Sequence, residues 1–83
     1  MTIFLEIKTP GNGKTYEFRI DGGITAEQAK RRIIDEIIEA EDGNITLNPD
    51  STALYDIDTQ KAVPGRFTLA ASDVKSGHVL LLL

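Results

Sequence analysis

The sequence has 83 residues, a formal net charge of −4 and 41% hydrophobic residues, which is typical of a single small folded domain over residues 1–83. The absence of cysteine excludes disulfides and thiolate metal sites, and the mild acidity argues against nonspecific nucleic-acid binding, which needs a basic face. The longest apolar run, Val79–Leu83, is far shorter than the ~20 residues of a membrane-spanning helix, and no signal-peptide pattern opens the chain, so we expect a cytoplasmic protein without direct membrane insertion.

The first twenty residues predict a β-hairpin. Apolar and polar residues alternate over Thr2–Lys8, which indicates a strand with one buried face. A Pro- and Gly-rich turn follows at Pro10–Gly13, and a second alternating segment runs over Thr15–Ile20.

A helix is predicted next. Thr25 is a suitable N-cap, and Gln28 three residues later completes a capping box. Gly43 suits the left-handed position that ends a helix. Apolar residues recur with helical spacing and predict a face that packs across a sheet: Ala26, Ala29, Ile33, Ile34, Ile37, Ile38 and Ala40.

The second half of the chain predicts short elements. Residues Asn44–Ser51 indicate an irregular crossing, Ala53–Ile57 a short strand and Ala62–Val63 a brief edge strand. Residues 67–74 carry isolated apolar anchors in a coil or a single helical turn, and Val79–Leu83 forms the last strand.

The order β-β-α-β-β-β predicts an α+β fold of the β-grasp type, with one helix across one face of a mixed sheet. In that arrangement the last strand lies centrally, beside the first. Half of the leucines in Val79–Leu83 then face the helix, and the other half face outward.

Several segments resemble ubiquitin-like proteins. The opening Met1–Leu5 is similar to the first strand of ubiquitin, and Thr68–Val74 followed by Val79–Leu83 resembles its last short helix and final strand. The segments "LYDIDTQKAV" and "TLAASDVKSGHVLLL" are similar to the bacterial YukD/EsaB-like branch, which is associated with type VII secretion. The resemblance implies a non-enzymatic protein-binding module, an accessory component of such a secretion system, without a cofactor.

The chain departs from ubiquitin-type modifiers at its end. Those modifiers carry a flexible tail that ends in Gly-Gly, whereas this sequence stops at Leu83 and its only Gly-Gly is Gly22–Gly23. Conjugation through this end is therefore not expected. Two alternatives stay open: a modifier made from a longer precursor, and a ubiquitin-like domain of a larger membrane or signalling protein.

Catalytic, nucleotide and metal sites are not expected. The tripeptide Gly13–Thr15 resembles the end of a P-loop, but Lys8 stands where that motif needs its first glycine, and a strand follows instead of a helix. His78 is the only histidine and is expected to be structural or solvated. Asp56 and Asp58 are expected on a solvated edge. No catalytic set of a nucleophile, a base and a residue that orients the base can be assembled from the sequence.

The charges of the predicted helix are divided by sign. Basic residues occupy Lys30–Arg32, whereas the second half carries only acids, an arrangement that opposes the helix dipole. Two interpretations stay open: a solvated face with ion pairs, and a bipolar docking surface. The ion pairs expected at i,i+4 spacing are Glu27–Arg31, Arg31–Asp35 and Arg32–Glu36.

The outward face of the sheet is the predicted binding surface. If Leu80 and Leu82 face the helix, Val79, Leu81 and Leu83 face away from it. The same counting places Tyr55 and Phe4 outward, and exposed apolar patches usually mark contacts. A covering loop or the opposite register would abolish the patch. The predicted protein-binding residues are Phe4, Tyr55, Val79 and Leu81.

Overall fold

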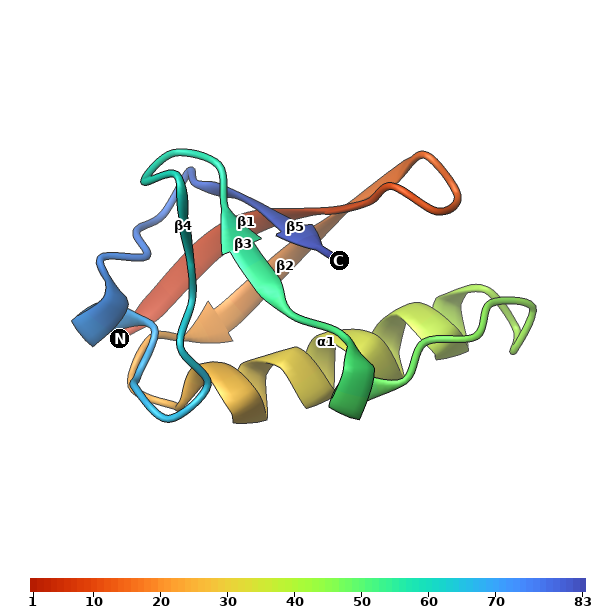
Figure 1. Cartoon of the computed structure of the whole chain (residues 1–83), viewed down its shortest axis with the longest axis horizontal. Helices are drawn as coiled ribbons and strands as arrows, with labels where there is room; N and C mark the ends of the chain where they lie inside the picture. Colours follow the sequence, from red (N-terminus) through yellow and green to blue (C-terminus); the bar gives the residue numbers. More distant parts are fainter.

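The computed structural model describes all 83 residues as one sheet with one helix across one face (Figure 1). The strand order in the sheet is β2-β1-β5-β3-β4, which confirms the predicted β-grasp arrangement. The strands and helix are β1 (Thr2–Thr9), β2 (Lys14–Asp21), α1 (Ala26–Ala40), β3 (Leu54–Asp56), β4 (Lys61–Ala62) and β5 (Val79–Leu82). Two short 3-10 turns, η1 (Pro49–Ser51) and η2 (Ala70–Ser72), lie in the connections.

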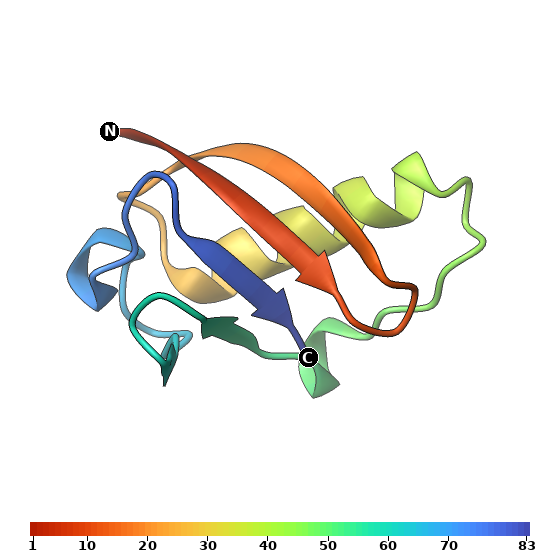
Figure 2. The ribbon, with the colours of Figure 1, turned by 90° about the horizontal axis from the view of Figure 1, so that it is seen from above.

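The centre of the sheet joins the two ends of the chain. β5 runs parallel to β1 and antiparallel to β3, so the last strand lies between them (Figure 2). β1 and β2 form the long antiparallel hairpin, in register from Thr2 opposite Asp21 to Thr9 opposite Lys14. β2 therefore forms one edge of the sheet and β4 the other.

The capping residues set the ends of α1. The Gln28 N–H donates to Thr25 Oγ1 over 3.2 Å, and the Thr25 N–H donates to Gln28 Oε1 over 3.0 Å, so the predicted capping box is confirmed. At the other end Gly43 adopts a φ of 77°, and its N–H donates to the Ile38 carbonyl over 2.9 Å. This left-handed position is one that glycine adopts without steric cost.

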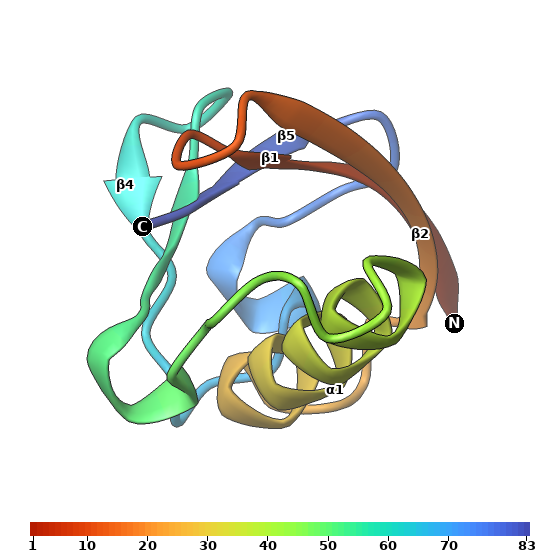
Figure 3. The same cartoon turned by 90° about the vertical axis from the view of Figure 1, so that its right-hand side faces the viewer.

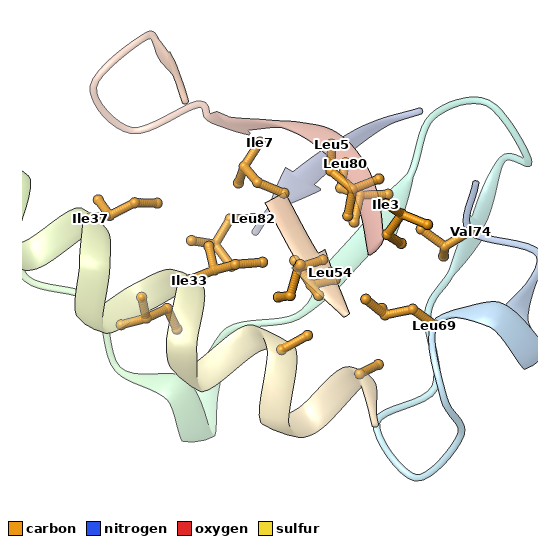
Figure 4. Close-up of a cluster of buried hydrophobic side chains, with 14 residues drawn as sticks. Ile3, Leu5, Ile7, Ile33, Ile37, Leu54, Leu69, Val74, Leu80 and Leu82 are labelled. Carbon is orange, nitrogen blue, oxygen red and sulfur yellow. The ribbon is translucent and has the colours of Figure 1, made fainter. Parts of the chain in front are cut away.

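The core lies between the sheet and α1. Side chains of the central strands point towards Ile33 and Ile37 of the helix (Figure 4). Leu80 and Leu82 are buried, so the predicted register of the last strand is confirmed. The fourteen buried apolar residues are Ile3, Leu5, Ile7, Ile20, Ala26, Ala29, Ile33, Ile34, Ile37, Leu54, Leu69, Val74, Leu80 and Leu82.

Short elements differ from the prediction by one or two residues. β3 covers only Leu54–Asp56, and β4 covers Lys61–Ala62 instead of Ala62–Val63. Val63 still bonds to the sheet, because its N–H donates to the Leu54 carbonyl over 2.9 Å. The crossing predicted as irregular contains η1, and the single helical turn expected near residue 70 is η2.

The ion pairs of α1 are partly those predicted. Arg31 pairs with Glu27 at 2.9 Å, and Arg32 pairs with Glu36 at 3.4 Å. The predicted Arg31–Asp35 pair is wrong: the guanidinium instead contacts Asp50 at 2.8 Å, because the crossing after the helix returns alongside it.

In addition, no helix of this chain has the length and apolar character needed to cross a bilayer.

Candidate protein-binding surface

The outer face of the sheet is the side opposite α1, and three of the four predicted residues meet there. Leu81 of β5 lies directly opposite Tyr55 of β3, and on its other side it lies beside Lys8 of β1. Val79, two residues earlier on β5, lies beside Glu6. Tyr55, Val79 and Leu81 are all partly exposed, and no loop buries them. The predicted cluster therefore forms at the centre of this face.

Ile57 extends this cluster and was missed from the sequence. Its N–H donates to the Val79 carbonyl over 2.9 Å, and its side chain is 40% exposed. The signal was available, because Ile57 is two residues after Tyr55 and alternation places both on one face. We call Tyr55, Ile57, Val79 and Leu81 the outer apolar patch. Leu83, also predicted to face outward, is 58% exposed.

Phe4 lies at the margin of the outer apolar patch. Its carbonyl accepts the N–H of Gly77 over 2.8 Å, so its neighbour in the turn before β5 has no side chain. The ring is 55% exposed, and the Arg19 guanidinium lies over it at 5.4 Å from the centroid. Such a cation–π contact fixes the ring on the outer face. Phe4 thus adds an exposed aromatic ring one row away from Val79.

Charged side chains border the outer apolar patch. Glu6 lies beside Val79 and Lys8 beside Leu81, both from β1 and both exposed. A partly apolar centre with a charged border is the usual composition of a protein-binding surface. The arrangement can bury apolar side chains of a partner while its border selects for complementary charge.

A buried carboxylate lies near the same strands, on the helix side of the sheet. Asp56 is only 1% exposed, so the predicted solvated position is wrong for this residue. Its Oδ1 accepts the N–H groups of Asp58 and Thr59 over 2.9 and 3.4 Å, and its Oδ2 lies 2.8 Å from Nδ1 of His78. These bonds compensate the burial of its charge. His78, which was expected to be structural or solvated, thus contacts Asp56 within the chain.

Asp58 completes this connection between β3 and β5. Its carboxylate accepts the Val79 N–H over 2.8 Å. The ligand atoms of Asp56, Asp58 and His78 lie within 4.8 Å of one another, a spacing that a metal ion could bridge. The carboxylates, however, already accept hydrogen bonds within the chain. These bonds hold His78 and the Val79 N–H, and they thereby position the start of β5. The cluster therefore supports the strand that carries the outer apolar patch.

Comparison with known proteins places the fold in the ubiquitin-like class. No protein-family model matches the chain, and no curated protein matches it either. The N-terminal ubiquitin-like domain of the 4931431F19Rik protein matches with a TM-score of 0.77 and 18% identity, over 99% of this chain and 73% of that one. The ubiquitin-like domain of Plasmodium falciparum Dsk2 matches with a TM-score of 0.73 and 18% identity, over the full length of both chains.

A designed protein shares the same architecture. It was designed de novo by Hydra on the basis of ubiquitin, and it matches with a TM-score of 0.71 and 17% identity, over 99% of this chain and 87% of that one. At such identities the likeness defines the fold alone. The chain thus has a ubiquitin-like fold.

Proposed function

We propose that this chain is a non-enzymatic ubiquitin-like module that binds a protein partner through the outer apolar patch and Phe4. The observation that carries the proposal is the row of partly exposed apolar side chains on neighbouring strands, opposite the face that α1 covers. A small acidic domain that leaves such side chains uncovered gains most from burying them against a partner. Binding requires no cofactor, nucleic acid or membrane insertion.

A more specific role follows from the resemblance of residues 54–63 and 68–82 to the YukD/EsaB-like branch. We propose a cytoplasmic accessory component of a bacterial type VII secretion system, made of one domain over residues 1–83. In that role the module would contact a component of the secretion machinery.

The proposed binding surface can be tested by affinity capture from the native cell with quantitative mass spectrometry. Leu81→Ser should weaken partner binding by about 1–3 kcal/mol, on the order of 5- to 150-fold, if Leu81 is an anchor of the interface. The matched control is Phe67→Ser, because Phe67 is 45% exposed and lies in the connection after β4, outside the outer apolar patch. The proposal fails if both variants capture the same partners with the affinity of the wild type.

A second candidate is a recognition domain within a longer protein. The observation that favours it is that two of the matched structures are ubiquitin-like domains, one of them N-terminal in its protein. Sequencing the reading frame on both sides of residues 1–83 distinguishes the two candidates. A continuous frame into a further domain supports this one, and stop codons at both boundaries exclude it.

A further inference from the structure

Three side chains that can bind a metal meet where the turn after β3 contacts the start of β5. Asp56 is the last residue of β3, Asp58 lies in the turn, and His78 directly precedes β5. Figure 3 shows this turn at the top of the molecule, far from α1. The pairing of β3 with β5 thus brings two carboxylates within 4.8 Å of an imidazole that lies about twenty residues later in the sequence.

No lysine or arginine neutralises the two carboxylates. Neither Asp56 nor Asp58 forms an ion pair with a basic side chain, and Lys61, which lies opposite Asp56 in the sheet, forms none either. Asp56 is only 1% exposed, so water screens its charge poorly. Buried charges in proteins are usually paired or bound to a metal, and a divalent cation would balance these two carboxylates.

The hydrogen bonds of the cluster leave room for coordination. A carboxylate has about four acceptor positions, so Asp56 can keep the two N–H groups of the turn on Oδ1 and bind a metal through Oδ2. One oxygen of Asp58 accepts the Val79 N–H, and the other has no hydrogen bond in the chain. The second oxygen of Asp58 is therefore a further ligand that costs no existing bond.

The imidazole can bind a metal without a change of its own charge. His78 Nδ1 lies 2.8 Å from Asp56 Oδ2, which requires a proton between the two atoms, and its Nε2 has no hydrogen bond in the chain. When a metal takes the place of this proton, the proton moves through solvent to Nε2 and the ring stays neutral. Only the long contact from the Lys75 N–H to Nδ1, at 3.4 Å, is lost.

Small movements complete a coordination shell of the zinc type. Tetrahedral zinc, with bonds of about 2.0–2.2 Å, holds its ligand atoms about 3.3–3.5 Å apart, so Nδ1 of His78 and Oδ2 of Asp56 have to separate by about 0.5 Å. The Asp58 side chain is exposed and can rotate inward. Imidazole is a ligand for zinc and similar metals, whereas calcium and magnesium prefer oxygen ligands alone.

We propose that Asp56 Oδ2, one oxygen of Asp58 and His78 Nδ1 bind a zinc ion, with water as the fourth ligand. The ion adds a link between β3 and β5 that the hydrogen bonds of the cluster already join. Ile57 and Val79 lie directly beside these ligands, and the Ile57 N–H donates to the Val79 carbonyl over 2.9 Å. Zinc would therefore hold this part of the outer apolar patch in one arrangement.

The test is isothermal titration calorimetry of the full chain with zinc chloride. We expect one ion per chain with a Kd of about 10 μM or tighter, and binding of calcium and magnesium at least about 100-fold weaker. Zinc at about 100 μM should raise the Tm by about 5–10 °C, because it binds only the folded chain. NMR should show slower hydrogen exchange at the Ile57 and Val79 amides in the presence of zinc.

Two conservative variants test the ligands. His78→Gln removes the imidazole but retains an N–H donor for Asp56, and Asp58→Asn removes one charge but retains an acceptor for the Val79 N–H. Each should weaken zinc binding by about tenfold or more. The matched control is Asp35→Asn, because Asp35 is an exposed residue of α1 without an ion pair, and its removal changes the net charge equally.

Three results would each overturn the proposal. The first is no zinc binding at about 1 mM, where even a weak complex would form. The second is equal affinity for zinc and calcium. The third is wild-type zinc affinity in either ligand variant, which would identify an adventitious ion elsewhere on the acidic surface. Circular dichroism verifies that each variant is folded, and the exposed position of Asp58 keeps the test decisive if His78→Gln unfolds.

Discussion

Leu80 and Leu81 are adjacent in β5, yet the structure predicts opposite consequences for their replacement by alanine. Leu80 is fully buried and lies between Ile7 and Asp56 in the sheet, whereas Leu81 is partly exposed on the outer face. Leu80→Ala removes three carbon atoms from the core, which costs about 2.4 kcal/mol of transfer free energy. The remaining cavity adds about 1 kcal/mol or more, so we expect a loss of about 3–4 kcal/mol.

Leu81→Ala should cost only about 1 kcal/mol, because much of the side chain already contacts water. A domain of 83 residues is expected to have a total stability of about 4–12 kcal/mol, so the buried change would remove a large share of it. The assay is urea denaturation followed by circular dichroism. With a slope of about 1 kcal/mol per molar urea, the midpoint should fall by about 3 M for Leu80→Ala and about 1 M for Leu81→Ala.

The comparison between the two neighbours tests the register of β5. An equal loss in the two variants would mean that hydrophobicity alone, not the direction of the side chains, determines their contribution. A larger loss for Leu81→Ala would refute the assignment of the outer face, because a shift by one residue exchanges the two faces of a strand.

Two further predictions concern polar contacts. Asp56→Ala should lower the free energy of unfolding by about 2–4 kcal/mol in urea denaturation, because charge-assisted bonds to His78 and to the turn are lost together; a loss no greater than that of Asp58→Ala would contradict this role. Hydrogen bonds from Lys14 and then from Tyr16 lower the pKa of Glu41 below 4.5, so the unfolded chain takes up the proton first as pH falls. The free energy of unfolding should therefore decline below about pH 4.5, and Glu41→Gln should make that decline shallower in thermal unfolding measured across pH; an unchanged slope would contradict the assignment.

Local patterns predicted the elements that depend on local contacts. The capping box needs only Thr25 and Gln28, three residues apart, and both bonds form as predicted. The burial of alternate residues in β1 and of one face of α1 follows from the periodicity of each element. In the uniformly apolar run Val79–Leu83, alternation leaves two registers open, and the structure has the one that was assumed, with Leu80 and Leu82 in the core.

Partners that are distant in the chain could not be predicted in this way. The burial of Asp56 is compensated by two sets of hydrogen bonds. One comes from the turn directly after Asp56, and the other comes from His78, 22 residues later. Arg31 pairs with Asp50 and not with Asp35, which is closer in the sequence, because the crossing after α1 folds back along the helix. An isolated aspartate or arginine in the sequence carries no mark of such a partner.

The candidate surface was predicted in part for a related physical reason. Alternation tells which face of the sheet a residue occupies, but the pairing of strands decides its neighbours on that face. Tyr55 and Leu81 came together because β3 and β5 pair in that register, whereas Phe4 lies opposite Gly77 and so remains at the margin. Ile57 lies within the predicted strand Ala53–Ile57, so alternation alone could have placed it beside Tyr55 on the outer face.

The central position of β5 has a consequence for the order in which the molecule can be made. During synthesis from the N-terminus, β1 and β2 can form a hairpin and pack on α1 as soon as they emerge, but β1 then presents an open edge. Closing that edge requires a strand about seventy positions later, and contacts of such separation form slowly. Until β5 inserts, the nascent chain displays unpaired backbone and uncovered apolar surface together, the combination that favours aggregation. Pairing of Val79–Leu82 with β1 therefore closes the sheet last. Protection by a chaperone would have its largest effect before these residues have emerged from the ribosome.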